Sequence, residues 1–341
     1  MTKVNIPGKL FLAGEYAITH PGNTAIIATI TTGLTIEIQD AQKNLSVAKS
    51  NTITKYWQFQ MGVTEDQYTD DWRYVRAAIK LLDDYVTNHQ IHSHLNNVNI
   101  TISSHLNSKS GKIGLGSSAA VVVGIIEALD RHFHLQLPIL TRFKLAGLAH
   151  LHVQKNGSLG DIAAITYGGI IAYQSPDLSL LPHINQQWLN PDIVDMAWPS
   201  LDIISLPWPV NWQILLGATH ESADTKVAIS HTQLTPQFLS QSQQIVQELI
   251  NTIIDVNYHK LTIKLRANQT LLTNQLPTGY VTPKLAFLLT TLGDTAGKIS
   301  GAGFGDNGFA ILNSHNDILA NTWKSYGIDA QIISISPQKR G

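Results

Sequence analysis

The sequence predicts a protein of the α+β class with two domains. Its 341 residues are more than one hydrophobic core usually supports, so two cores are expected. The first hundred residues contain mainly short β-branched or alternating apolar segments, whereas later segments repeat apolar residues at helical spacing. Each half therefore mixes strands and helices without a regular alternation, which is typical of α+β domains.

Strands and one helix are predicted in the first hundred residues. Residues 24–30 and 34–38 contain β-branched, partly alternating apolar positions, which favour two strands. Residues 71–86 form a predicted helix, because their apolar residues recur at helical spacing. A further strand is expected at 98–102, followed by a polar turn at 107–112.

Three helices and a strand complete the first half. One helix follows a glycine- and serine-rich loop and runs to about Phe133. Pro138 is expected in the first turn of the next helix, a favoured position for proline, and that helix should end near Lys155. Residues 161–167 predict a short helix, and 169–173 a strand.

The second half begins after a stretch rich in proline and tryptophan. This stretch, 182–209, is expected to cross between domains spanning residues 1–205 and 206–341. A strand should follow, and three helices should come after it. The chain is then expected to finish with a strand, a glycine turn, a second strand, a helix and a last strand. The expected positions are 212–218 for the strand, 236–258, 261–276 and 283–297 for the helices, and 309–312 and 330–335 for the last two strands.

Composition excludes several classes of function. Apolar residues make up 43% and charged residues 14%, and the net charge of -1 indicates no basic surface for nucleic acid. The absence of cysteine excludes disulfides and thiolate chemistry, and it fits a cytoplasmic protein. We expect no secretory signal at the start, no membrane-spanning segment, and no zinc site, because the histidines form no H-E-x-x-H pair.

The first of three glycine-rich segments lies near the start of the chain. Residues 7–16 read Pro-Gly-Lys-Leu-Phe-Leu-Ala-Gly-Glu-Tyr. A lysine beside a Pro-Gly turn at the beginning of a strand is held in a fixed direction, so Lys9 is a candidate functional residue. Taken alone, an ordinary solvated lysine explains this position better, because short motif matches are common.

The second segment, residues 114–120, reads Gly-Leu-Gly-Ser-Ser-Ala-Ala. Small residues let the backbone approach a phosphate closely, and the helix that follows directs free N–H groups and its positive dipole end at the loop. The two serines supply hydroxyls for phosphate or magnesium. No Gly-Lys-Ser/Thr follows, so this is not a Walker A loop; a serine N-cap after a glycine turn is the alternative.

The third segment, residues 300–308, has glycines at 301, 303, 305 and 308 between two predicted strands. Such a run suits either a tight hairpin or a backbone nest that binds an anion. The local sequence supports both interpretations about equally.

The three segments, in this order and spacing, resemble the motifs of the GHMP kinases, a family of galacto-, homoserine, mevalonate and phosphomevalonate kinases. Its motifs are PGK-x-x-L-x-GEY, GLGSSAA and a glycine run in the second domain. The resemblance covers nearly the whole chain. It implies an ATP-dependent small-molecule kinase, with an N-terminal domain like the second domain of ribosomal protein S5, a ferredoxin-like C-terminal domain, and an active site between them.

Further segments resemble the phosphomevalonate kinase branch. They are 156–169, which contains Gly-Ser-Leu-Gly-Asp-Ile-Ala, then 222–226, Ser-Ala-Asp-Thr-Lys, and 298–306. Phe304 and Asn307 depart from the branch, where a glycine and a cysteine stand. A positive φ is unfavourable for phenylalanine, so we expect the loop to bend elsewhere or ligand approach to be altered.

His150 argues against the mevalonate kinase branch. Members of that branch resemble one another in a glutamate that binds magnesium, eleven positions before the catalytic aspartate, and His150 stands there in this chain. Neutral histidine is a poor ligand for a hard cation such as magnesium. We therefore expect His150 to be a packed helix residue rather than a ligand.

The resemblance also implies a set of site residues. Lys9 would stabilise charge on the transferring phosphoryl group, and Asp161 would orient Lys9 and the acceptor, although an aspartate at a helix start is more often an N-cap. Ser118 would bind Mg²⁺. The implied ATP contacts are Gly114, Leu115, Gly116, Ser117, Ser118 and Ala119, and the implied acceptor contacts are Tyr16, Ser158, Lys226, Ser300, Gly301 and Ala302.

The function that follows is Mg-ATP-dependent phosphorylation of phosphomevalonate to diphosphomevalonate. The alternatives are another GHMP kinase acting on mevalonate, homoserine or a sugar, the related ATP-dependent diphosphomevalonate decarboxylase, and an inactive binding module on the same fold. Release of CO₂ would distinguish the decarboxylase. The expected partners are the small-molecule substrate and ATP, without nucleic acid or membrane, in a monomer or homodimer.

Overall fold

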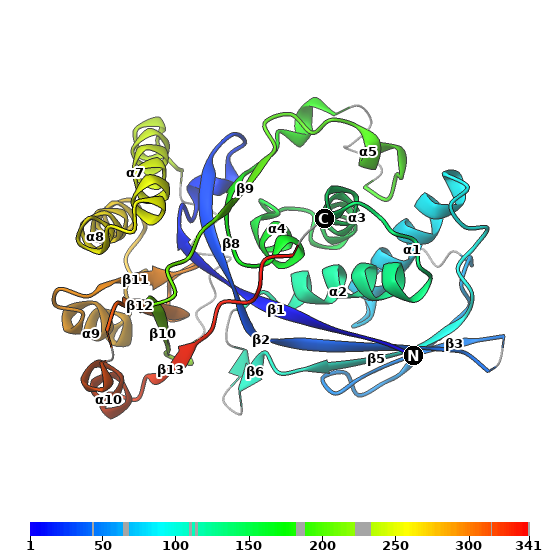
Figure 1. Ribbon diagram of the computed structural model, residues 1–341, viewed down its shortest axis with the longest axis horizontal. Helices are drawn as coiled ribbons and strands as arrows, with labels where there is room; N and C mark the ends of the chain where they lie inside the picture. Colours follow the sequence, from blue (N-terminus) through cyan, green and yellow to red (C-terminus); the bar gives the residue numbers. More distant parts are fainter. Residues whose placement is uncertain are drawn as a thin grey trace.

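The structure, a computed structural model, shows two units that each contain a β-sheet (Figure 1). The predicted α+β class is therefore confirmed. The described residues are 1–42, 44–63, 68–108, 111–112, 115–181, 188–221, 233–314 and 316–339, with backbone only at 107–108 and 111–112.

The first unit contains a mixed sheet in the order β4-β3-β5-β2-β8-β9, with β1 paired to β2. Neighbouring strands are antiparallel except β3 and β5. Its strands are β1 (Thr2–Ala13), β2 (Thr24–Asp40), β3 (Ser46–Ser50), β4 (Trp57–Phe59), β5 (Val98–Ser104), β8 (Ile170–Gln174) and β9 (Asp202–Leu206).

β2 corrects one sequence prediction, because it is a single strand through the break expected between residues 30 and 34. Gly33 explains how the strand continues. A Cβ at Gly33 would lie 1.7 Å from the Ile6 carbonyl oxygen, so only glycine fits where β1 shifts register at Pro7 and Gly8. The long β2 can therefore pair with β1, β5 and β8.

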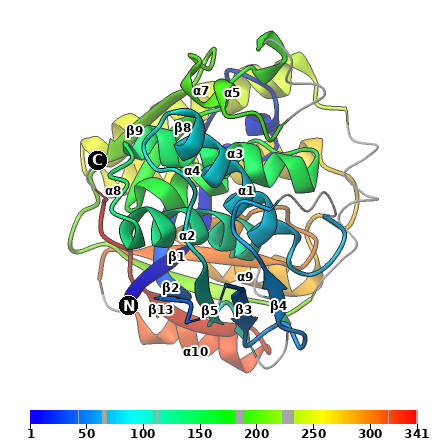
Figure 2. The ribbon, with the colours of Figure 1, turned by 90° about the vertical axis from the view of Figure 1, so that its right-hand side faces the viewer.

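Helices cover one face of this sheet in two layers (Figure 2). α2 and α4 lie against β1 and β2, and α1 and α3 pack outside them. Predicted bounds agree within two residues, although Pro138 is the N-cap of α3 rather than a first-turn residue. The helices and short elements are α1 (Arg73–Asn88), α2 (Ser117–His132), α3 (Ile139–Gln154), α4 (Gly160–Tyr167), α5 (Asp192–Asp195), η1 (Ala17–Thr19), η2 (Leu178–Leu180), β6 (Asn107–Ser108) and β7 (Gly111–Lys112).

The second unit is an antiparallel sheet in the order β11-β12-β10-β13. Its element order is strand, helices, two strands, helix, strand, which is the ferredoxin-like arrangement that the resemblance implied. Its elements are β10 (Gln213–Ala218), α7 (Pro236–Ile254), α8 (Tyr258–Gln275), α9 (Pro283–Thr291), β11 (Ala296–Ser300), β12 (Asn307–Leu312), α10 (Asp317–Ser325) and β13 (Asp329–Ile333).

Two further predictions are corrected in this half. The helix expected at 283–297 ends at Thr291, because residues from Ala296 onward form β11; a Cβ at Gly297 would lie 2.3 Å from the Phe309 carbonyl oxygen of β12. The stretch 182–209 was expected to cross between domains. However, its residues in β9 pair with β8 and belong to the first sheet, while residues 182–187 lie outside the described part.

The end of the chain returns to the first unit (Figure 1). The Ser336 amide donates to the Thr29 carbonyl at 2.9 Å, the Lys339 amide donates to the Tyr167 carbonyl at 2.7 Å, and the Lys339 ammonium pairs with Glu127 of α2. These contacts of residues 336–339 link the second unit to the first. The domain division at residue 205 remains a prediction. No helix in the described part of the chain has the length and apolar character needed to cross a membrane.

Candidate active site

A cavity of about 420 Å³ lies where the three glycine-rich segments meet. That volume is within the range of small-molecule sites. Elements of both units contribute to it: β1 and its following turn, α2, α3, the start of α4, and the turn after β11. Its lining residues are Lys9, Phe11, Glu15, Tyr16, Ile18, Thr19, Ser118, His150, Gln154, Asn156, Gly157, Ser158, Leu159, Asp161, Gly301, Ala302 and Asp306.

Lys9 is held between the first and second segments. Its backbone amide donates to the Leu115 carbonyl at 3.0 Å. Gly116 has φ 83°, and a Cβ there would lie 2.9 Å from Lys9 Cγ, so the glycine makes room for the lysine stem. The ammonium lies 5.2 Å from the centre of the Phe11 ring. The lysine therefore has a fixed direction. The Pro-Gly turn expected at a strand start is absent, because Pro7 and Gly8 lie inside β1, where its register shifts.

The second segment forms the start of α2, with Gly116 as the N-cap. Ser118, in the first turn, lines the cavity, whereas Leu115 and Ala119 are buried in the core. Leu115 and Ala119 can therefore offer a ligand only backbone atoms. The first-turn N–H groups have no partner within the helix and carry its positive dipole end, so they suit an anion. Gly114 lies outside the described residues.

His150 lies in the cavity wall, contacting Ser118. Its Nε2 is 3.2 Å from the Ser118 hydroxyl oxygen, and 6% of the residue is exposed. Burial lowers the pKa of His150, and the negative charge of Asp161 opposes this shift without reversing it. The imidazole is therefore neutral at pH 7. It was expected to be a packed helix residue. It is packed, but it also contacts a predicted site residue, which spacing alone could not indicate.

Asp161 is the second residue of α4 and lines the cavity. The N-cap is Leu159, so the alternative that Asp161 caps the helix is wrong. Its carboxylate accepts from the Ile162 amide at 3.0 Å. Ser158 also lines the cavity, and its hydroxyl accepts from the Gly160 amide at 3.4 Å. Leu159 has φ 63°, an unfavourable backbone conformation often found at functional sites.

The third segment turns sharply beside the cavity. Gly301, Ala302 and Asp306 line it, and positive φ angles occur at Gly301, Gly303 and Gly305. Burial raises the pKa of Asp306, while the positive charge of Lys9 opposes that rise. Asp306 therefore lies within electrostatic reach of Lys9. Sequence analysis included Asp306 in a motif without giving it a site role.

Phe304 corrects an expectation, because it does adopt a positive φ, of 56°. Its side chain is 4% exposed and packs edge-on against Tyr280, with ring centres 6.0 Å apart. Its amide donates to the Tyr280 carbonyl at 2.9 Å. Burial of the ring offsets the unfavourable backbone conformation. The turn thus keeps a glycine-like shape without a glycine at this position.

Two side-chain hydrogen bonds connect the first segment to the third. The Ser300 hydroxyl donates to the Phe11 carbonyl at 2.8 Å, and the Tyr16 hydroxyl donates to the Ala302 carbonyl. Burial raises the pKa of Tyr16, and the charges of Glu15 and Asp306 add to the rise, so its phenol stays protonated. Ser300 is buried and does not line the cavity. Its hydroxyl therefore links the two units, and the structure does not place it where it could contact the acceptor.

Glu15 and Lys298 form an ion pair that sequence analysis missed. Lys298 is fully buried in β11, and its ammonium lies 2.6 Å from Glu15 Oε1. Burial lowers the pKa of Lys298, and Glu15 opposes that shift. Glu15 lines the cavity, and its Oε2 has no hydrogen-bond partner among the described residues. Both residues lie within the recognised motifs, but only the fold brings them together.

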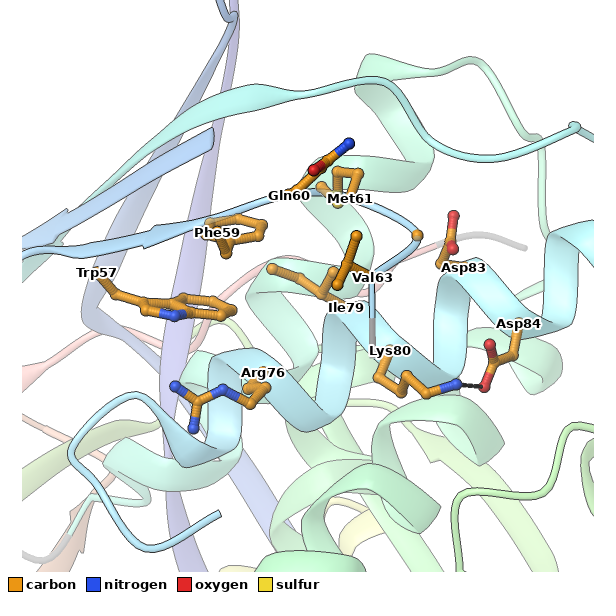
Figure 3. Close-up of a pocket in the computed structure, with 11 residues that line it drawn as sticks. Trp57, Phe59, Gln60, Met61, Val63, Arg76, Ile79, Lys80, Asp83 and Asp84 are labelled. Carbon is orange, nitrogen blue, oxygen red and sulfur yellow. Dashed lines mark hydrogen bonds and ion pairs between the residues drawn. The ribbon is translucent and has the colours of Figure 1, made fainter. Parts of the chain in front are cut away.

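A second hollow, of about 30 Å³, lies between α1 and the residues after β4 (Figure 3). It has room for water only. The Arg76 guanidinium lies 4.7 Å from the Trp57 ring centre, and an ion pair between Lys80 and Asp84 stands at the edge. It contains no predicted site residue. Lys226, the last predicted acceptor contact, lies outside the described residues.

Comparison with known proteins identifies this architecture. The GHMP kinases N terminal domain matches residues 73–169, from the start of α1 to just beyond α4, including Ser118 and Asp161. The chain therefore resembles the GHMP kinases. It is 29% identical to the phosphomevalonate kinase of Streptomyces sp. (strain CL190), over 94% of both chains.

Three further relatives bear on the branch. The structure of Streptococcus pneumoniae phosphomevalonate kinase in complex with phosphomevalonate and AMPPNP matches 99% of this chain and all of its own, with a TM-score of 0.86 and 25% identity. The mevalonate kinase of Methanocaldococcus jannaschii is 28% identical over 49% of this chain and 52% of its own length. The mevalonate kinase of Saccharolobus solfataricus also matches over the full length, at 23% identity over all of this chain and 98% of its own. The protein is thus a kinase that resembles both phosphomevalonate and mevalonate kinases over its whole length, with the higher identity to a phosphomevalonate kinase.

Proposed function

We propose that this protein transfers the γ-phosphoryl group of ATP to phosphomevalonate, forming diphosphomevalonate and ADP. The observation that supports the acceptor assignment is the higher identity to a phosphomevalonate kinase, 29% over 94% of the chain, than to a full-length mevalonate kinase, 23% over all of the chain. His150, in place of a magnesium-binding glutamate, is a second argument against mevalonate as the acceptor. The catalytic site is the cavity between the predicted domains 1–205 and 206–341.

Nucleotide phosphates would lie against the first turn of α2, with Mg²⁺ bound to Ser118. The donor atoms around the cavity fit a hard cation, because the Ser118 hydroxyl and the Asp161 and Asp306 carboxylates are oxygen donors. Among the described residues no group of three His, Asp or Glu could hold a metal ion. Phosphate oxygens and water would therefore supply most ligands, as is usual for magnesium. Bound there, the ion neutralises charge on the phosphates.

The remaining site residues act by position and charge. Lys9 stabilises the negative charge that moves from nucleotide to acceptor, and Asp161 orients Lys9 and the acceptor. Ser158, Gly301 and Ala302 contact the acceptor, together with Tyr16. A phosphate monoester has a second pKa near 6, so it is mostly dianionic at neutral pH and needs little deprotonation. No strong general base is then required.

Replacement of Ser118 by alanine should weaken the magnesium dependence and lower kcat by about tenfold, the scale of one lost polar interaction. Folding should be retained, because the helix keeps its glycine N-cap. The measurement is kcat against free Mg²⁺, with the thermal unfolding midpoint as the folding control. An unchanged kcat and magnesium profile would mean that Ser118 is only a helix-start residue.

Asp161→Asn should lower kcat by roughly 100-fold, the scale found when a reacting group is displaced by about 1 Å. The acidic limb of the pH–rate profile should remain, because the ionisation that matters is that of the acceptor's phosphate, near pH ~6. The rate should rise as pH increases through this value in both wild type and variant. Loss of the acidic limb in Asp161→Asn would instead identify Asp161 as a general base.

An acceptor screen tests the proposed function. ADP release is measured with phosphomevalonate, mevalonate, homoserine, galactose and diphosphomevalonate at saturating Mg-ATP, and CO₂ is measured in parallel. Phosphomevalonate alone should support turnover, without CO₂. Turnover of mevalonate but not phosphomevalonate would overturn the acceptor and leave the GHMP kinase assignment intact. Release of CO₂ from diphosphomevalonate would favour the decarboxylase.

A further inference from the structure

The loop between α3 and α4 brings Ser158 to the cavity through an unfavourable backbone conformation. Leu159, the N-cap of α4, has φ 63°, a conformation in which the Cβ of a leucine crowds the backbone. Such a conformation persists only where the surrounding structure fixes it. Ser158 and Asp161, which stand just before and just after it, both line the cavity. The contacts that fix Leu159 therefore also decide where these polar groups point.

Two contacts hold this loop. The first is the Leu159 side chain, which is 2% exposed and packs against α3. A Cβ at Gly147 of α3 would lie 3.1 Å from Leu159 Cδ1, so the glycine makes room for the leucine. The second is the Tyr173 hydroxyl of β8, which donates to the Ser158 carbonyl at 2.6 Å. The helix layer thus holds Leu159, and the sheet holds the residue before it.

Tyr173 is fixed in place before any ligand binds. Its strand β8 lies between β2 and β9, where Tyr173 pairs with Ala25 and Ile203, and β8 packs beside α4 (Figure 1). The residue is completely buried, and its ring meets that of Phe143 edge-on, with ring centres 6.2 Å apart. Burial raises the pKa of Tyr173 well above its usual value, and the charge of Asp161 adds to the rise. The phenol therefore stays a hydrogen-bond donor throughout the pH range of an assay.

The Ser158 hydroxyl has a hydrogen to offer a ligand. Its oxygen accepts from the Gly160 amide at 3.4 Å, and no hydrogen bond within the described part of the chain uses its own hydrogen. A serine hydroxyl donates one hydrogen bond and can accept others at the same time. Phosphate and carboxylate groups need donors, and bonds to such charged groups are the stronger ones. Ser158 is therefore suited to an anionic group of the acceptor.

We infer that Tyr173, which does not line the cavity, is a positioning residue that holds the Ser158 carbonyl so that the Ser158 hydroxyl points at an anionic group of the acceptor. Without the phenol this carbonyl loses its donor and turns toward water, and Leu159 can leave its positive φ. The hydroxyl then moves away from the acceptor. Nucleotide binding against α2 should not depend on Tyr173. The inference rests on the proposed function, in which Ser158 contacts the acceptor.

Tyr173→Phe tests this role, because it removes the hydroxyl and keeps the shape of the ring. Isothermal titration calorimetry measures the affinities for phosphomevalonate and for Mg-AMPPNP separately, without turnover. The affinity for phosphomevalonate should fall about tenfold, the scale of one lost hydrogen bond, while that for Mg-AMPPNP stays within about threefold of wild type. The value of kcat should also stay within about threefold, because the contact is made equally in the ground and transition states.

Tyr258→Phe is the matched control for a general loss of stability. The Tyr258 hydroxyl donates to the Ile311 carbonyl at 2.6 Å and also accepts from the Ala296 amide at 3.2 Å, in the second unit and outside the cavity lining. Its removal should leave both affinities unchanged. The inference is overturned if Tyr173→Phe binds phosphomevalonate normally, if it loses acceptor and nucleotide affinity equally, or if Tyr258→Phe weakens acceptor binding as much.

A double-mutant cycle with Ser158→Ala shows whether Tyr173 acts through Ser158. Once the Ser158 hydroxyl is gone, Tyr173→Phe should weaken acceptor binding much less than it does alone, whereas additive losses would contradict the inference. If Tyr173→Phe does not fold, Leu159→Ala enters the same cycle and should likewise be less than additive. A wild type that binds mevalonate instead of phosphomevalonate would overturn the proposed acceptor, and the cycle measured with mevalonate would still decide the role of Tyr173.

Discussion

Replacement of Lys9 by alanine should lower kcat on the order of 10²–10³-fold, comparable to the loss of one preorganised electrostatic group. The lysine stem lies against Gly116, its amide is bonded to Leu115, and its charge reaches Asp306, so the ammonium is held in place before substrate binds. Because it acts mainly where charge moves, affinity for ATP should change much less than kcat. Steady-state kinetics with separate nucleotide-binding measurements check both values.

Lys3 is the matched control, since it lies on the same strand with a 55% exposed side chain that pairs with Glu37. Lys3→Ala should leave kcat unchanged, because exposed ion pairs contribute little. Combining Lys9→Ala with Asp161→Asn should give a loss far smaller than the product of the two single losses, because the two residues are expected to act as one unit. Near-normal kcat in Lys9→Ala would remove this lysine from the mechanism.

Lys298→Met should reduce the free energy of unfolding by about 3–5 kcal/mol, the usual consequence of removing one partner of a buried ion pair. Lys298 is fully buried, and Glu15, its partner at 2.6 Å, is 3% exposed. The substitution would leave a buried carboxylate without its counter-charge. Urea unfolding followed by tryptophan fluorescence measures the change.

A double substitution shows whether the unpaired charge causes the loss. Glu15→Gln added to Lys298→Met should restore much of the stability, because no buried charge remains. Lys3→Met, which breaks the exposed pair with Glu37, should cost less than about 1 kcal/mol. A Lys298→Met protein as stable as wild type, or a double variant less stable than the single one, would contradict a structural role for this pair.

The apolar patterns predicted the α+β class, and the family resemblance carried by the glycine-rich segments implied a site between the domains, where these segments meet at one cavity. Such motifs are contiguous in sequence and combine turn residues with a helix start, so local chemistry indicates them. The helices of the first unit were predicted within two residues, because their apolar periodicity is local. In the second unit α7 ends at Ile254 rather than 258, α8 begins at Tyr258 rather than 261, and α9 ends at Thr291 rather than 297. The site roles of Lys9, Ser118 and Asp161 remain predictions, although all three line the cavity.

What the sequence could not indicate depends on contacts between distant residues. The pairing of Glu15 with Lys298 joins positions that only the two-unit fold brings together. Phe304 tolerates a positive φ because Tyr280 packs against its ring, which no local rule anticipates. The break expected in β2 is absent because Gly33 fits against Ile6 of the neighbouring strand. His150 gains its contact with Ser118 from the packing of α3 beside α2.

Phosphorus NMR of the reaction with phosphomevalonate and Mg-ATP tests the central claim most directly. The account predicts that the phosphomonoester singlet of the acceptor disappears while two coupled doublets of a diphosphate ester and the signals of ADP appear, in equal amounts. The acceptor carbon skeleton should stay intact, with no CO₂ released. A persistent singlet with phosphomevalonate, combined with a new phosphomonoester singlet when mevalonate is supplied, would contradict the account.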